Sequence, residues 1–174
     1  MIRFILVYGV IAGLIVMSNY AVALFGGHNG HSLWAGYTVM LAALSLVFIG
    51  IKRYRDTQLG GVIRFTTALG VGFGIAAVAS AMYVLGWEVY MWATHYTFFD
   101  DYAQSVIAAK RAHGASEADI AKLSAQMAEM GRSYANPLYR MMMTLLEIAP
   151  VGVIVTLISA GLLRMRGFLP ACGR

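Results

Sequence analysis

The stretch LYRMMMTLLEIAPVGVIVTLISAGLL, at residues 138–163, is long enough to cross a lipid bilayer as one helix. A bilayer core needs about 20 apolar residues in an α-helix, and between Met141 and Ala160 the single charged side chain is Glu147. The stretch lacks the strict polar–apolar alternation of a membrane barrel strand. Because backbone polar groups cannot reach water inside lipid, a helix is the form that can span there. Residues 138–163 therefore predict a transmembrane helix.

Three further apolar stretches precede it, at about residues 4–25, 33–51 and 62–92. The first resembles a signal peptide, because Arg3 precedes it and Ala21-Val22-Ala23 has the form of a cleavage site. Its apolar run is longer than the about 7–15 residues of a signal sequence, so we expect a retained membrane helix. The sequence thus predicts an all-α integral membrane protein, with one membrane domain over residues 1–174 and four transmembrane helices.

Composition supports this class. The 174-residue chain is 60% hydrophobic and 12% charged, whereas soluble domains have about 25% charged residues. So little charge excludes a soluble globular enzyme, and so apolar a chain is not disordered. The net charge of +5 does not indicate nucleic-acid binding, because the basic residues flank the apolar stretches. The single cysteine, Cys172, excludes an internal disulfide and a thiolate metal framework.

The basic residues predict how the chain crosses the membrane. With a cytoplasmic N-terminus, the outer segments carry equal numbers of acidic and basic residues, and the cytoplasmic segments are strongly positive. Trp34, Trp87 and Trp92 then fall at the outer interface, as in an aromatic belt. We therefore expect both termini in the cytoplasm. The cytoplasmic charges are Arg3, Lys52, Arg53, Arg55, Asp56, Arg64, Arg164, Arg166 and Arg174.

The segment at about residues 95–136 is the only sizeable polar part of the chain. Apolar residues recur at three- and four-residue spacing on both sides of Gly114, which predicts two amphipathic helices. Ser116 can cap the second helix, and Asn136 followed by Pro137 can begin the fourth span. We expect a periplasmic helical hairpin whose apolar stripes are buried against the bundle, lipid headgroups or a partner.

Glu147 is the charged residue that topology leaves unexplained. A charged residue inside a span costs about 2.5–3.5 kcal/mol and is a candidate functional site. Pro150 lies three residues later and leaves the carbonyl of Leu146 without its helical donor. Glu147 and Pro150, with Glu88 and Arg140, are the candidates for a proton, ion or polar site. Alternatively, Glu147 is structural and bonds Arg140, a tyrosine or a serine or threonine hydroxyl, while Glu88 is an interfacial acid.

Small residues at helix-packing spacing predict close contacts between helices, because small side chains let two backbones approach. The contact is either within the bundle or the seam of a homodimer. These residues are Gly9 and Gly13 in the first span, and Gly70, Gly74, Ala77 and Ala81 in the third.

Histidines offer only a weak metal site. His28 and His31 lie in a glycine-rich outer turn, and His95 is at the same level, with Asp100 or Asp101 nearby. Loop spacing of this kind is common among solvated histidines, so we expect no metal and no cofactor. The chain also lacks the sequence motifs of hydrolases and phosphate-binding enzymes.

The order of several motifs resembles a bacterial membrane family, domain of unknown function 4199. Its most specific parts here are IKRYRD at residues 51–56 and the E-x-x-P-V-G pattern at residues 147–152. The resemblance covers nearly the whole chain. It implies a four-span protein of the bacterial cytoplasmic membrane and carries no established activity.

These observations favour a non-enzymatic assembly or accessory protein in contact with membrane lipids, acting as a homodimer or within a larger membrane complex. The alternative is a proton- or small-solute-coupled transport element that uses Glu147 beside the Pro150 helix break. A lipid-handling protein or a membrane-embedded enzyme is the third hypothesis.

Overall fold

The computed structural model describes residues 1–26, 33–165 and 167–170, and every regular element in these ranges is a helix. His28, His31 and Cys172 lie outside the described residues. The predicted all-α class is therefore confirmed for the described part of the chain. The helices are α1 Ile2–Gly26, α2 Leu33–Gln58, α3 Phe65–Ala93, α4 Phe98–Ala112, α5 Glu117–Tyr134 and α6 Pro137–Leu163.

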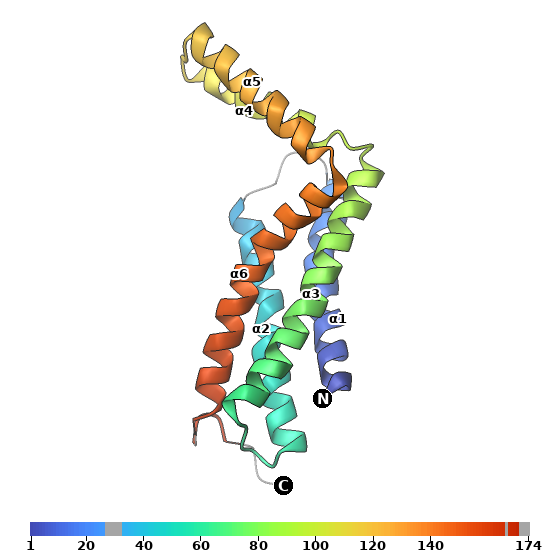
Figure 1. Cartoon of the computed structure of the whole chain (residues 1–174), viewed down its shortest axis with the longest axis vertical. Coiled ribbons are helices and arrows are strands. Elements are labelled where there is room, and N and C mark those ends of the chain that lie inside the picture. Colours follow the sequence, from blue (N-terminus) through green and yellow to red (C-terminus); the bar gives the residue numbers. More distant parts are fainter. Residues whose placement is uncertain (27–32, 166, 171–174) are drawn as a thin grey trace.

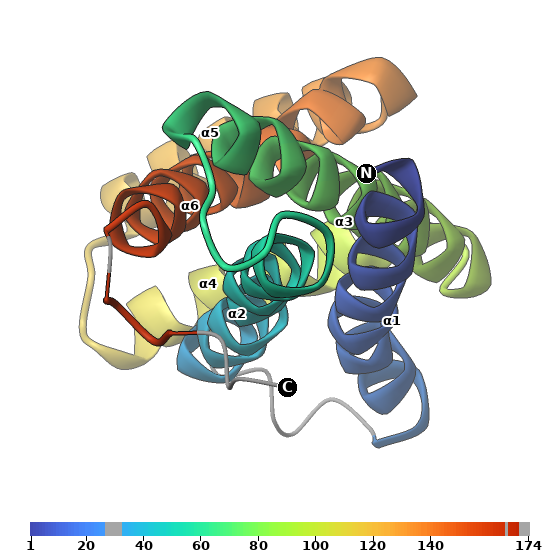
Figure 2. The ribbon, with the colours of Figure 1, turned by 90° about the horizontal axis from the view of Figure 1, so that it is seen from below.

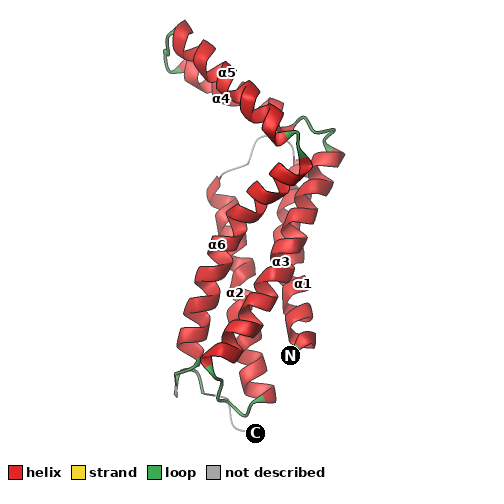
Figure 3. Ribbon diagram, in the orientation of Figure 1, coloured by secondary structure: helices red, strands yellow, loops and turns green. Residues whose placement is uncertain are grey.

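Four of the helices, α1, α2, α3 and α6, form an elongated bundle (Figures 1 and 3). Each is long and apolar enough to cross a membrane, which confirms the prediction of four candidate spans. Helix α3 packs against α1, α6 and α2, so it is the central contact of the bundle. Figure 2 shows α3 between α1 and α6 when the bundle is seen from below.

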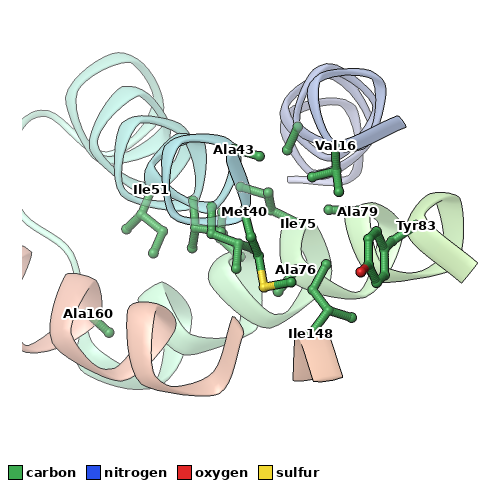
Figure 4. Packing of buried hydrophobic residues seen from close by; sticks show 14 of the residues in the cluster. Val16, Met40, Ala43, Ile51, Ile75, Ala76, Ala79, Tyr83, Ile148 and Ala160 are labelled. Carbon is green, nitrogen blue, oxygen red and sulfur yellow. The ribbon is translucent and has the colours of Figure 1, made fainter. Parts of the chain in front are cut away.

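The core lies along the inner faces of these four helices. Val16 of α1, Ala43 of α2, Ile75 of α3 and Ile148 of α6 are all buried within it (Figure 4). Each position belongs to a helical stripe that faces the other helices, while the outward-facing apolar side chains stay exposed, as expected for a bundle surrounded by lipid.

Helix α2 runs further than the sequence predicts. The basic run after Ile51 was expected to end the second span, but the helix continues to Gln58. Lys52 and Asp56 form an ion pair of 2.6 Å one helical turn apart, which supports a helix at these positions. The charged run is therefore the last part of α2.

The predicted helical hairpin is present as α4 and α5. Gly114, with φ of +76°, follows α4, and the Ser116 side chain accepts a hydrogen bond from the Asp119 backbone N–H at the start of α5. Asn136 caps α6, which begins at Pro137, as the sequence predicts. The hairpin projects obliquely from one end of the bundle, called here the hairpin end (Figure 1). Within α4 and α5 only Ile120 is buried, so the hairpin is not folded back onto the bundle.

Several small residues lie where α1 meets α3 within one chain. A Cβ added at Gly9 would lie 2.6 Å from the Val78 Cβ, and one at Gly13 would lie 2.5 Å from the Met82 Sδ. A Cβ at Gly74 would meet Ile5 of α1, at 2.6 Å. These three glycines thus serve packing within the bundle. The remaining members of the set, Gly70, Ala77 and Ala81, are exposed.

This packing gives a direct prediction. Gly9→Ala should lower the free energy of unfolding by about 1–3 kcal/mol, because Val78 and the Ile75 carbonyl leave no room for a Cβ. The measurement is the unfolding midpoint in detergent. Gly70→Ala is the matched control, because a Cβ there meets open space, and it should preserve or slightly raise stability. Equal losses in the two variants would contradict the close approach of α1 and α3.

Candidate functional site

Polar side chains gather at three levels of the bundle. The hairpin-end cluster consists of Trp87, Glu88, Tyr96, Tyr134 and Arg140. Two further groups lie in the middle of the bundle and at its opposite end. Each group joins helices that are distant in sequence.

The hairpin-end cluster is built on an ion pair between α3 and α6. The Arg140 Nε donates to Glu88 Oε1 at 2.8 Å and its Nη2 donates to Oε2 at 2.5 Å. A third bond runs from Nη1 to the Tyr134 carbonyl, at 3.1 Å. Arg140 is 2% exposed. This bidentate geometry is the strong form of an arginine–carboxylate contact, so the pair fixes α3 and α6 to each other and to the end of α5.

Aromatic side chains complete this cluster. The Arg140 guanidinium carbon lies 5.2 Å from the Tyr96 ring centroid and 5.9 Å from that of Tyr134. The Trp87 Nε1 donates to the Tyr134 hydroxyl at 2.8 Å. Burial raises the pKa of the Tyr134 phenol to about 12, so the hydroxyl is neutral at physiological pH. Tyr134 thus contacts α3 through its hydroxyl and α6 through its backbone carbonyl.

The mid-bundle cluster consists of Tyr20, Tyr83 and Glu147, from α1, α3 and α6. The Tyr83 hydroxyl donates to Glu147 Oε2 at 3.1 Å, and the Tyr20 and Tyr83 rings stack with centroids 5.4 Å apart. The buried Tyr20 hydroxyl makes no hydrogen bond of ordinary geometry to any described residue. Of the partners that the sequence left open for Glu147, the structure forms the bond to a tyrosine, while Arg140 binds Glu88.

Glu147 itself is exposed on the side of α6. Its neighbour Pro150 lies inside α6, which stays helical through it. In Figure 1 the half of α6 nearer the hairpin leans towards α3, whereas the other half follows the bundle. A proline within a helix is a common cause of such a change of direction. Pro150 therefore does not break the helix as the sequence suggested, and the change of direction in α6 lies within one turn of the carboxylate.

At the opposite end of the bundle, Arg55 forms a group that we call the Arg55 clamp, with Lys52, Asp56 and the carbonyls after α6. Arg55 is 2% exposed. Its Nη1 donates to the carbonyls of Leu163 and Phe168, at 3.4 and 3.0 Å, and its Nη2 donates to that of Leu169 at 2.5 Å. Its Nε donates to Asp56 at 2.7 Å. Arg55 therefore satisfies the Leu163 carbonyl, which the end of α6 leaves unpaired, and two carbonyls of the chain beyond the helix.

Sequence reasoning found some members of these groups and missed others. It singled out Glu88, Arg140 and Glu147, but not Tyr20 and Tyr83, which belong to apolar spans. A tyrosine in the interior of a span was the available signal, because its hydroxyl needs a partner there. The Arg55 clamp was also missed, since Arg55 was counted among the orientation charges.

The described residues do not form a group of side chains that could bind a metal ion. Among the described residues, no group of three or more histidine, cysteine, aspartate or glutamate side chains lies close enough to hold a metal ion. His95 is exposed, and the loop that contains His28 and His31 lies outside the described part.

These features define a class of protein: a helical bundle with four helices fit to span a membrane, joined by buried polar contacts and carrying a projecting hairpin. The chain belongs to the family described as Protein of unknown function (DUF4199), which matches residues 7–165. The resemblance seen in the sequence is thereby confirmed. No curated protein and no solved structure matches the chain.

Proposed function

We propose that this chain is a non-enzymatic assembly or accessory protein of the bacterial cytoplasmic membrane, which acts by binding another membrane-spanning chain. In this proposal the termini are cytoplasmic and the hairpin is periplasmic. The sorting of basic residues in the sequence supports that orientation.

The observation that carries the proposal is the position of Glu147. It is exposed on α6 beside Leu146, which is 60% exposed, and near Met143 and Ile154, which are 47% and 56% exposed. These apolar side chains suit contact with lipid, whereas the Glu147 carboxyl has a single hydrogen-bond donor among the described residues, the Tyr83 hydroxyl. A carboxyl group inside a span is costly when it has too few hydrogen-bond partners. A second chain that covers Glu147 and supplies the missing donor would therefore form a more stable complex.

The surroundings of Glu147 also indicate the chemistry of that partner. From Met142 to Ile158, every exposed side chain of α6 other than Glu147 is apolar. A homodimer through α6 would therefore bring two Glu147 carboxyls together, which requires a shared proton. A different membrane helix with a hydroxyl, amide or basic side chain supplies the donor directly. We therefore favour a heteromeric complex, with the proton-sharing homodimer as the second form.

Two substitutions of Glu147 test this proposal. Glu147→Leu should weaken the complex in native membranes by about five- to thirty-fold, the equivalent of one interhelical hydrogen bond. Glu147→Gln should keep most of the binding, because the amide still accepts and donates hydrogen bonds. Crosslinking in membranes, followed by native mass measurement of lipid particles, gives the bound fraction. A wild-type chain found only as a monomer without crosslinked partners would contradict the proposal.

A second candidate function, a proton- or small-solute-coupled transport element, is favoured by the mid-bundle cluster. Tyr83 bonds Glu147 and stacks on Tyr20, whose buried hydroxyl makes no hydrogen bond of ordinary geometry within the described part of the chain. These groups extend from the side of α6 to α1. In this function Glu147→Gln would abolish proton flux into liposomes that hold a pH-sensitive dye, since glutamine does not titrate. Unchanged flux in this variant would exclude the transport hypothesis.

A further inference from the structure

A cavity of about 360 Å³ opens at the hairpin end, beside the hairpin-end cluster. Its walls come from the last turns of α3, the start of α4, the end of α5 and the first turn of α6. The residues that matter for its chemistry are Tyr96, Phe99, Asp100, Tyr134 and Arg140. The cavity is therefore lined by three aromatic rings and by one charged group of each sign.

Arg140 supplies hydrogen-bond donors to this cavity. Its guanidinium has five N–H groups, and three hydrogen bonds to Glu88 and Tyr134 use three of them. The other two have no partner among the described residues. A guanidinium that is 2% exposed and lines a cavity is suited to oxygen atoms of a phosphate, which arginine binds well.

Asp100 supplies the opposite charge. It is exposed in the first turn of α4 and lines the same cavity. Because Glu88 already balances the charge of Arg140, the Asp100 carboxylate makes the cavity attractive to a cation as well. The Phe99 ring beside it adds an aromatic wall, and aromatic rings favour ammonium groups. A ligand that carries both a phosphate and an ammonium group matches both walls.

The position of the cavity indicates where that ligand comes from. The cavity lies beside the last turn of α3 and the first turn of α6, the ends of two candidate spans that meet at this level. A second hollow of about 490 Å³, lined by Trp92, Ala93, His95 and Tyr96, adjoins it, since Tyr96 lines both. Trp92 is 70% exposed, as is common for tryptophan at a membrane interface. The second hollow leaves room for the glycerol end of a lipid.

We propose that this cavity binds the phosphoethanolamine headgroup of a membrane phospholipid. The phosphate oxygens accept hydrogen bonds from the free N–H groups of Arg140, and the ammonium group pairs with Asp100. This site is separate from Glu147 and does not depend on the assembly function. The proposal assigns the protein a binding site for one class of phospholipid.

The test compares lipids in nanodiscs that hold the full-length chain in an equal mixture of phosphatidylethanolamine and phosphatidylglycerol. Native mass spectrometry then shows which lipid stays bound as the disc is removed. Phosphatidylglycerol has the phosphate without the ammonium group, so the wild-type chain should retain phosphatidylethanolamine in preference to it. A wild-type chain without this preference would overturn the proposal.

Variants locate the effect in the cavity. Asp100→Asn should reduce retention of phosphatidylethanolamine by about fivefold or more, the loss expected for a charge-assisted contact. Asp101→Asn is the matched control, because it removes the same charge from the same turn but does not line the cavity, and it should leave retention unchanged. Ala135→Leu adds bulk to the cavity wall and should also release the lipid. Equal effects of Asp100→Asn and Asp101→Asn would overturn the assignment to this cavity.

A soluble competitor distinguishes a membrane phospholipid from a soluble aminophosphate, which carries the same phosphate and ammonium groups. Free phosphoethanolamine lacks the glycerol and acyl parts, so it should not displace the bound lipid at millimolar concentration. Displacement at that concentration would overturn the membrane lipid as the ligand and assign the cavity to a soluble aminophosphate.

Discussion

Arg140→Leu is expected to lower the free energy of unfolding by about 3–5 kcal/mol. The substitution removes both hydrogen bonds to Glu88 and the bond to the Tyr134 carbonyl. Glu88 would lose its cationic partner while its side chain is only 17% exposed, and breaking a buried pair from one side is strongly destabilising. Unfolding by denaturant in detergent micelles, followed by circular dichroism, measures the change.

A double variant separates the cost of an orphaned charge from the cost of lost packing. Arg140→Leu combined with Glu88→Leu should recover part of the stability lost in the single variant, because no unpaired charge remains. Arg140→Lys keeps the charge but loses the two-pronged geometry, so an intermediate loss is expected. A double variant less stable than Arg140→Leu would show that the ion pair is not what Glu88 contributes.

Arg55→Ala is expected to have an effect of similar size, about 3–5 kcal/mol. Arg55 is 2% exposed and bonds three carbonyls at and beyond the end of α6. Its loss would leave those carbonyls without this donor, and Asp56 would keep only its bond to Lys52. The chain after α6 should then open, and trypsin should cut after Arg164 at least several times faster than in the wild type.

Arg53→Ala is the control for this experiment, because Arg53 lies two residues away on α2 and is exposed. Exposed surface substitutions usually change stability by less than about 0.5 kcal/mol. Unchanged proteolysis in the Arg55 variant would contradict the role of the clamp. The clamp also gives a physical reason for the end of the IKRYRD segment: Arg55 holds α2 to the end of α6, and Asp56 accepts a hydrogen bond from Arg55.

The spans and the helix ends could be predicted from the sequence because they depend on residues that are close together in the chain. Four apolar stretches indicate four spans, and Gly114, Ser116 and Asn136 mark helix ends because their chemistry suits turns and caps. Each of these features depends on residues within a few positions of one another. They define the elements but not how the elements meet.

Contacts between distant residues account for what the sequence left open. Arg140 lies two helical turns before Glu147 on the same helix, yet it binds Glu88 of α3. That choice depends on the rotation of α6 against α3. Likewise, Gly9 and Gly70 are equivalent as small residues in a span, but only Gly9 is packed against another helix. The burial of Arg55 also follows from the path of the chain after α6.

The attachment of the hairpin has a mechanical consequence. Helix α5 is joined to α3 by the Trp87–Tyr134 hydrogen bond and to α6 by the bond from Arg140 to the Tyr134 carbonyl. The start of α4 also packs on α3, where the Phe98 ring lies 4.8 Å from that of Trp87. Beyond this base the hairpin projects from the bundle (Figure 1), so it is a lever whose fulcrum is formed by Phe98 and Tyr134. A pull on its tip is delivered as torque to α3 and α6, the two helices that hold Tyr83 and Glu147 together.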